Sequence, residues 1–234
     1  MKNNFKEQLK VNIKDDRFFH YKKFVIQQQE QFEIYINYLN RYINSLRSEG
    51  VASNSLRIRA RIKAAESALK NDDRKALDDV FGIEIICESD NEINTVRELI
   101  EKYVYILKQK IHDKENGYKA IHCSFYLNDK IIEMLTRDSA NKEARKLFPI
   151  IEVQYKTENV FQKANFGSAS HEKYKKIDIN LIKKLYENNQ LKLGINLPFI
   201  WVSDPNHNTM RKLSTDEVIE AMYPSLKLKE KERI

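Results

Sequence analysis

The sequence contains few of the residues that punctuate loops, with only five glycines and four prolines in 234 residues. This scarcity argues against internal repeats and long flexible linkers. The two cysteines, Cys87 and Cys123, lie in separate apolar runs, which is typical of reduced core residues and not of a disulfide framework. The sequence has no Cys/His metal pattern, no run of about 18 apolar residues and no apolar segment after its first residues. We therefore expect no membrane span and a cytoplasmic location.

What the chain has in excess is positive charge. Lys and Arg total 41 against 34 Asp and Glu, which gives a net charge of +7, and 41% of the residues are apolar. The apolar fraction is enough for a sizeable core in one large domain, or in one domain with helical additions. The positive balance favours anionic partners such as nucleotides, RNA or acidic surfaces, and a charged solvated surface is the alternative.

The stretch Leu56–Lys63 alternates between apolar and basic residues. Period two predicts a strand, and it places four cations on one face: Arg57, Arg59, Arg61 and Lys63. Cations in such a row repel each other unless an anion lies over them, and a polyphosphate is the obvious candidate. The alternative is an exposed edge strand protected by charge. A helix is expected over residues 64–71, with Ser67 one turn after Lys63.

Two further stretches carry acids on predicted strands. Asp79 stands at the entry of a strand over residues 79–87, where a carboxylate suits Mg²⁺, although a loop between helix and strand would also explain it. Glu152 and Gln154 are two apart in an inner strand over residues 148–157, so both point to the same face. An acid and an amide there are costly unless something binds them, and the alternative is a half-buried strand with one polar face.

A turn at Asn116-Gly117 presents Tyr118, and His122 follows on the next predicted strand. A tyrosine at the edge of a sheet is a good stacking surface for a base, whereas His122 alone would more often be a core histidine. Lys22 and Lys23 form a basic–aromatic patch on a helix over residues 15–49, which is either a solvated face or an RNA contact. The remaining expectations are a hairpin turn at residues 128–129 and helices over residues 92–103, 137–147, 162–176, 179–188 and 215–223.

Together these stretches, from about Arg57 to Lys176, resemble the RelA/SpoT-type alarmone synthetase domain, and in size the small single-domain alarmone synthetases. The motifs that carry the resemblance are Arg61-Ile62-Lys63 with Ser67, Asp79-x-x-Gly82-Ile83, Asn116-Gly117-Tyr118-x-x-x-His122, Glu152-x-Gln154-x-Lys156-Thr157, and Phe166-Gly167 to His171 with Tyr174-Lys175. The resemblance implies an α+β fold with a nucleotidyltransferase-like mixed sheet flanked by helices. It divides the chain into an N-terminal helical segment (1–50), the synthetase core (51–176) and a C-terminal helical extension (177–234).

The activity that the resemblance implies is transfer of the β,γ-pyrophosphate of ATP to the 3′-hydroxyl of GDP or GTP, with Mg²⁺ as cofactor. By position, the catalytic residues are Asp79, Glu152 and Gln154, of which Asp79 and Glu152 also bind the metal. The ATP-binding residues are Arg57, Arg59, Arg61, Lys63, Ser67 and Lys70. The acceptor-binding residues are Tyr118, His122, Lys156, His171 and Lys175.

The chain departs from the family pattern at three positions that concern phosphate and base binding. Glu84 stands where the family usually has an arginine thought to flank the adenine, Asn71 replaces a lysine, and Lys156 replaces an arginine. One alternative is therefore a toxic small alarmone synthetase that pyrophosphorylates the 3′ CCA end of tRNA, with an antitoxin protein as partner and Lys22 and Lys23 as RNA contacts. A non-catalytic nucleotide- or RNA-binding module is a second alternative, and a homo-oligomer is a further open possibility.

Overall fold

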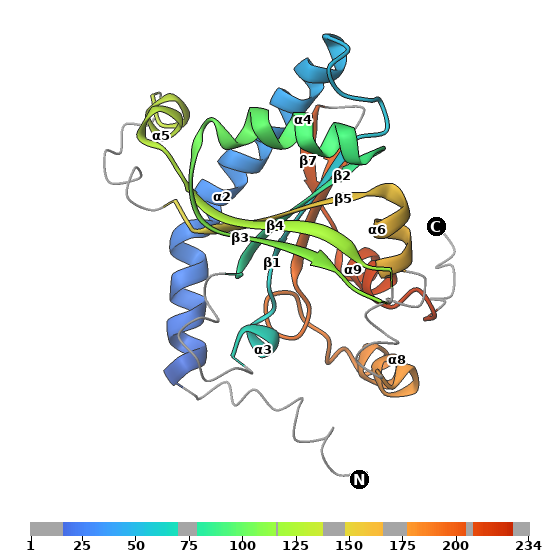
Figure 1. The fold of residues 1–234 in the computed structure, drawn as a ribbon. Helices are drawn as coiled ribbons and strands as arrows, with labels where there is room; N and C mark the ends of the chain where they lie inside the picture. The colour runs from blue at the N-terminus through green and yellow to red at the C-terminus, as the bar shows by residue number, and fades with distance from the viewer. Residues whose placement is uncertain are drawn as a thin grey trace.

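A computed structural model describes residues 16–69, 79–115, 117–137, 148–165, 177–204 and 208–226. Within these ranges a mixed sheet of seven strands has the order β3-β4-β5-β2-β1-β6-β7 (Figure 1). β2 and β5 pair in parallel, and the other neighbouring strands pair antiparallel. The strands are β1 (Arg57–Ile62), β2 (Phe81–Cys87), β3 (Val104–Asp113), β4 (Lys119–Leu127), β5 (Ile151–Thr157), β6 (Phe199–Asp204) and β7 (Thr209–Lys212).

Helices cover both faces of this sheet, which confirms the predicted α+β fold. The helices are α2 (Asp16–Ser48), α3 (Ala65–Ala68), α4 (Asp90–Glu101), α5 (Asp129–Leu135), α6 (Glu158–Asn165), α8 (Ile179–Glu187) and α9 (Thr215–Met222). The long helix α2 ends before Gly50, whose φ of 71° is readily adopted only by glycine among common residues. A capping box opens α9, where Ser214 and Glu217 satisfy each other's backbone amides.

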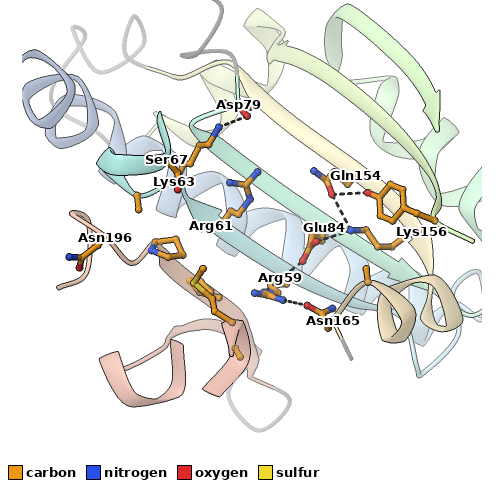
Figure 2. A pocket seen from close by; sticks show the side chains of 17 residues that line it. Arg59, Arg61, Lys63, Ser67, Asp79, Glu84, Gln154, Lys156, Asn165 and Asn196 are labelled. Atoms are coloured by element: carbon orange, nitrogen blue, oxygen red, sulfur yellow. Dashed lines mark hydrogen bonds and ion pairs between the residues drawn. The ribbon is translucent and has the colours of Figure 1, made fainter. Parts of the chain in front are cut away.

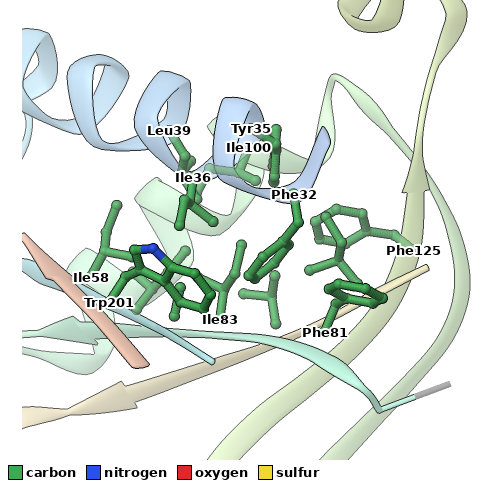
Figure 3. Close-up of a cluster of buried hydrophobic side chains, with 14 of the residues drawn as sticks. Phe32, Tyr35, Ile36, Leu39, Ile58, Phe81, Ile83, Ile100, Phe125 and Trp201 are labelled. Carbon is green, nitrogen blue, oxygen red and sulfur yellow. The ribbon is translucent and has the colours of Figure 1, made fainter. Parts of the chain in front are cut away.

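The main core lies between α2 and the sheet, with α4 packed beside it (Figure 3). Phe32 of α2 is fully buried, and its ring centroid lies 5.1 Å from that of Phe81 on β2 and 6.0 Å from that of Trp201 on β6. Burial of side chains of this size stabilises the fold by about 1.5–3 kcal/mol each. Because this face of the sheet is apolar, the alternate residues of the same strands are left for the opposite, polar face.

The C-terminal part differs from its predicted helical character. Residues 177–226 contain α8 and α9, but β6 and β7 also join the sheet, and β6 pairs with β1. The run at Phe199–Val202 is too short for a helix, and as a strand it buries Ile200 and Trp201 on opposite faces. The same pairing excludes the edge-strand explanation of the basic strand, since β1 lies between β2 and β6.

A second correction concerns the hairpin turn predicted at residues 128–129. Asn128 instead caps α5, because its side-chain oxygen accepts a hydrogen bond from the backbone amide of Ile131. Asn is a strong N-cap residue, and Ile131, Ile132 and Leu135 recur at helical spacing behind it. The helix predicted over residues 137–147, and the part after residue 165 of the helix predicted over residues 162–176, fall almost entirely outside the described residues. The proposed boundaries of the three segments remain predictions.

None of the helices in the described ranges is long and apolar enough to cross a membrane.

Candidate active site

Strand register builds the polar face of the sheet in rows. Arg61 on β1 lies opposite Gly82 on β2, which lies opposite Glu152 on β5 and then Ser124 on β4. The next row, two residues along each strand, contains Arg59, Glu84, Gln154 and His122. Residues that are up to 95 positions apart in the sequence, such as Arg59 and Gln154, therefore share one row on one surface.

A cavity of about 410 Å³ opens on this face (Figure 2). In the view of Figure 2, Lys63, Ser67 and Asp79 gather at one end, and Glu84 and Lys156 lie at the other. The polar residues that line it are Arg59, Arg61, Lys63, Ser67, Asp79, Glu84, Tyr118, Gln154, Lys156, Asn165 and Asn196. The rest of the lining is apolar and comes largely from β6, α9 and the loop before β6: Ala64, Ala164, Pro198, Ile200, Ala221 and Met222.

Lys63 and Asp79 form an ion pair at the first end of the cavity. Lys63 Nζ donates to Asp79 Oδ2 over 2.7 Å, while the other carboxylate oxygen, Oδ1, is buried and has no hydrogen-bond partner among the described residues. A buried, unpartnered carboxylate oxygen is costly in a site that holds nothing. Mg²⁺ binds in proteins through one or two carboxylates and keeps its remaining positions for water and substrate phosphates. Asp79 thus fits a magnesium ligand. Glu152, which stands on the same face of the sheet but is not among the residues that line the cavity, is a second candidate ligand.

Arg61 reaches toward Glu152 across Gly82. One of its guanidinium nitrogens lies 3.8 Å from Glu152 Oε2, and a Cβ atom at position 82 would lie 3.2 Å from Arg61 Nε. A side chain in β2 at this point would push against the arginine. Glycine is therefore required here for close approach and not for a special backbone conformation.

Glu152 is the centre of a hydrogen-bond network. Its carboxylate accepts from Gln154 Nε2 over 2.9 Å and lies 3.2 Å from His122 Nδ1, and the Tyr118 hydroxyl lies 2.9 Å from His122 Nε2. Burial raises the pKa of Glu152, but the hydrogen bonds from His122 and Gln154 and the charge of Arg61 outweigh it and lower the pKa to about 2. Glu152 is therefore an ionised, acceptor-only group at neutral pH.

Tyr118 lines the cavity and closes this network. Its hydroxyl also reaches Gln154 Oε1 at 3.5 Å, and the ammonium groups of Lys114 and Lys156 lie 5.4 and 5.6 Å from its ring centroid. Burial, together with the charges of Glu84 and Glu152, raises the pKa of Tyr118, so it stays a neutral phenol at physiological pH.

Glu84 and Lys156 form a buried ion pair at the second end of the cavity. Lys156 Nζ donates to Glu84 Oε1 over 2.7 Å and to Gln154 Oε1 over 3.0 Å, and only 2% of the Lys156 side chain is exposed. Arg59 Nε lies 3.7 Å from Glu84 Oε2. Burial raises the pKa of Glu84, but Lys156 and Arg59 outweigh it and lower the pKa to about 2. The charge of Lys156, which the family pattern assigns to acceptor phosphate, is thus already compensated.

Other predicted site residues lie elsewhere. Arg57 does not line the cavity; it pairs with Glu158 at 2.7 Å and covers the ring of Phe161. Lys22 lines a separate, mainly apolar cavity beside Lys63, and Lys23 is exposed on α2. Three predicted residues fall outside the described ranges: Lys70, His171 and Lys175.

Sequence patterns did not indicate the residues that line the cavity from outside the recognised motifs. Asn165 comes from the end of α6, where its Oδ1 atom lies 3.4 Å from an Arg59 nitrogen. Ala164 precedes it, and the others follow residue 190: Asn196, Pro198, Ile200, Ala221 and Met222. The apolar run containing Trp201 was visible in the sequence, but nothing in it showed that β6 would pair with the basic strand.

A cationic strand, carboxylates that could hold a divalent metal ion, and a cavity on the same face of the sheet are the parts that phosphoryl transfer requires. Residues 53–178, more than half of the chain, match the region found in RelA/SpoT proteins, and the chain belongs to this family. Membership supports a pyrophosphotransferase of the alarmone-synthetase kind, a class that uses a divalent metal ion.

Two solved structures share the fold. The small alarmone synthetase 1 from Bacillus subtilis is 16% identical, with a TM-score of 0.50 over 73% of this chain and 88% of that one. A GTP pyrophosphokinase family protein from Streptococcus pneumoniae is 17% identical, with a TM-score of 0.50 over 73% of this chain and 86% of that one. Among curated proteins, none matches the chain significantly.

Proposed function

We propose that the protein transfers the β,γ-pyrophosphate of ATP to the 3′-hydroxyl of a guanine nucleotide. The observation that supports this most directly is the placement of Arg61 between two carboxylates on the polar face of the sheet. Asp79 pairs with Lys63, two residues after Arg61 in the chain, and Glu152 lies across Gly82. Cations for phosphate oxygens thus stand beside an ionised acceptor for a hydroxyl proton.

Lys63, Ser67 and Arg61 would hold the triphosphate of the donor. Lys63 supplies a point charge and three donors, while the planar guanidinium of Arg61 matches two phosphate oxygens at once. Asp79 and Glu152 would hold Mg²⁺, which neutralises the charge of the phosphate oxygens when it is bound. The cavity is large enough for a nucleotide, at about 410 Å³.

The acceptor side of the site would be built by Glu152, His122 and Tyr118. The 3′-oxygen attacks the β-phosphorus of ATP, the bond between that phosphorus and the α,β-bridging oxygen breaks, and AMP leaves. The hydroxyl proton passes to the Glu152 carboxylate. With a pKa of about 2, Glu152 is a weak base, so its main contribution is to orient the hydroxyl and to stabilise the positive charge that develops on it.

The test is incubation with Mg²⁺ and ATP labelled in the γ-phosphate, with GDP, GTP or deacylated tRNA as acceptor. We expect label in a guanine nucleotide from the wild-type protein and none from Glu152→Gln. Glu133→Gln, an exposed change on α5, is the matched control and should leave transfer unchanged. If no acceptor gains label although the protein binds ATP tightly, a non-catalytic nucleotide-binding module would be supported instead.

A second candidate acceptor is the 3′ end of tRNA, and the Glu84–Lys156 pair favours it. A free guanine nucleotide brings two or three 5′-phosphates that need cations, but the Lys156 charge is already taken by Glu84. A terminal nucleotide within a polynucleotide brings fewer charges to the same place. Label in tRNA, with GDP and GTP unlabelled, would show that this acceptor is the correct one.

A further inference from the structure

The C-terminal part of the chain gives the cavity an apolar side. The family match ends at residue 178, yet Pro198, Ile200, Ala221 and Met222 line the cavity. Ile200 lies opposite Arg61 in the pairing of β6 with β1, so it stands on the same face of the sheet. It is almost fully buried in a second, smaller apolar core formed by β6, α8 and α9, against which Met222 of α9 also packs. The apolar side is therefore held rigidly against the sheet.

The basic strand β1 lies between this apolar side and Glu84, the carboxylate at the second end of the cavity. Arg59 and Arg61 form the floor in the middle, β6 lies on one side of them, and Glu84 of β2 lies on the other. A guanidinium plane stacks well on an aromatic ring, and apolar side chains cover the ring without competing for hydrogen bonds. Arg59 and Lys63 are four residues apart, which is about 13 Å along a strand. That distance leaves room for a sugar between phosphates at Lys63 and a base at Arg59.

Glu84 has hydrogen-bonding capacity left on the side that faces Arg59. Its Oε1 atom accepts the short bond from Lys156, whereas Arg59 Nε lies 3.7 Å from Oε2, beyond hydrogen-bond distance. An ionised carboxylate can only accept, so it favours an amino group at the edge of a base. The 6-amino group of adenine is such a donor.

We propose that Glu84 is a specificity-determining residue that accepts a hydrogen bond from the 6-amino group of the donor adenine, which lies on Arg59 against the apolar side formed by Pro198, Ile200 and Met222. This role rests on the proposed use of ATP as donor. The proposal gives a function to Glu84, where the chain departs from the family pattern, and to the C-terminal residues that line the cavity beyond the family match, which ends at residue 178.

The experiment compares the binding of ATP with that of purine riboside 5′-triphosphate, which has hydrogen in place of the 6-amino group, by calorimetry in the presence of Mg²⁺. For the wild-type protein we expect ATP to bind about 10–100-fold more tightly, the range for a hydrogen bond to a charged group. In Glu84→Leu/Lys156→Met, which replaces both partners of the buried ion pair so that neither is left without the other, the two nucleotides should bind within about threefold of each other.

A matched control variant and a second probe distinguish a wrong role for Glu84 from a wrong donor nucleotide. Glu158→Gln removes a glutamate that pairs with Arg57 outside the cavity, and it should keep the wild-type preference. Ala221→Phe, which fills the apolar side, should weaken ATP at least tenfold and leave the affinity for inorganic tripolyphosphate unchanged. Equal binding of the two nucleotides by a wild-type protein that transfers pyrophosphate would overturn the role of Glu84 alone. A wild-type protein that binds neither nucleotide would overturn both proposals.

Discussion

Replacing Gly82 by alanine should reduce pyrophosphate transfer without unfolding the protein. The new methyl group would lie 3.2 Å from Nε and 3.3 Å from Cγ of Arg61, closer than such atoms normally approach. The obstructing atoms belong to a flexible side chain, so the guanidinium is expected to move and the strand to stay in place. In a strand, alanine also restricts the unfolded chain more than glycine does, which offsets part of the steric cost.

The size of the effect follows from what Arg61 contacts. Its guanidinium lies 3.8 Å from Glu152 Oε2, and in the proposed reaction it holds phosphate oxygens. One interaction with a charged group contributes about 1.5–3 kcal/mol, so its loss should lower kcat/KM by about 10–100-fold. The free energy of unfolding should change by about 1 kcal/mol or less.

A double-mutant cycle measures whether Gly82 acts through Arg61. Rates of label transfer from ATP are compared for the wild type, Gly82→Ala, Arg61→Ala and the double variant. Once Arg61 is shortened, the methyl group has little to displace, so Gly82→Ala should then cost less than about twofold. Equal losses in both backgrounds would show that Gly82 matters for the strand itself and not for the position of Arg61.

Three further predictions concern the charged groups. Asp79→Asn should abolish transfer while the circular dichroism spectrum and melting temperature stay near wild type, and near-normal turnover would remove Asp79 from the site. Because folding lowers the pKa of Glu84 to about 2 from an ordinary value near 4.5, its contribution to stability is complete above about pH 4.5 and is lost as the pH falls toward 2. Urea unfolding between pH 2 and 7 should therefore show a smaller acid loss in Glu84→Leu/Lys156→Met, and identical pH profiles would contradict this. Lys22→Ala/Lys23→Ala should leave transfer to GDP unchanged across a salt series, whereas a lower salt dependence of tRNA binding in this variant would identify the two lysines as RNA contacts.

Local patterns predicted the parts of the site that depend on a single strand. The alternation in Leu56–Lys63 correctly gave a strand with its cations on one face, because the side-chain period of a strand is two. The same rule placed Glu152 and Gln154 together, and their side chains are hydrogen-bonded to each other. Within one strand, sequence spacing alone fixes which side chains share a face.

Sequence spacing could not predict the parts of the site that depend on pairing between strands. Nothing near Gly82 in the sequence shows that Arg61 lies over it, since that contact requires the register of β1 on β2. The contribution of β6 was missed for the same reason. A run of about six apolar residues fits a strand or part of a buried helix, and only its pairing with β1 brings Ile200 to the cavity.

The charges on the polar face show why the pairing between strands matters for function. Taken alone, the cations of β1 repel each other and call for an anion, but the fold supplies anions of its own. Lys63 pairs with Asp79, Arg61 lies beside Glu152, and Arg59 and Lys156 share Glu84. A phosphate group that binds here must replace a carboxylate as the partner of a cation. The binding free energy that it gains is therefore only the difference between two ion pairs. Phosphate binding then becomes favourable when another cation takes over the carboxylates, and Mg²⁺ on Asp79 and Glu152 would release Lys63 and Arg61 for the donor.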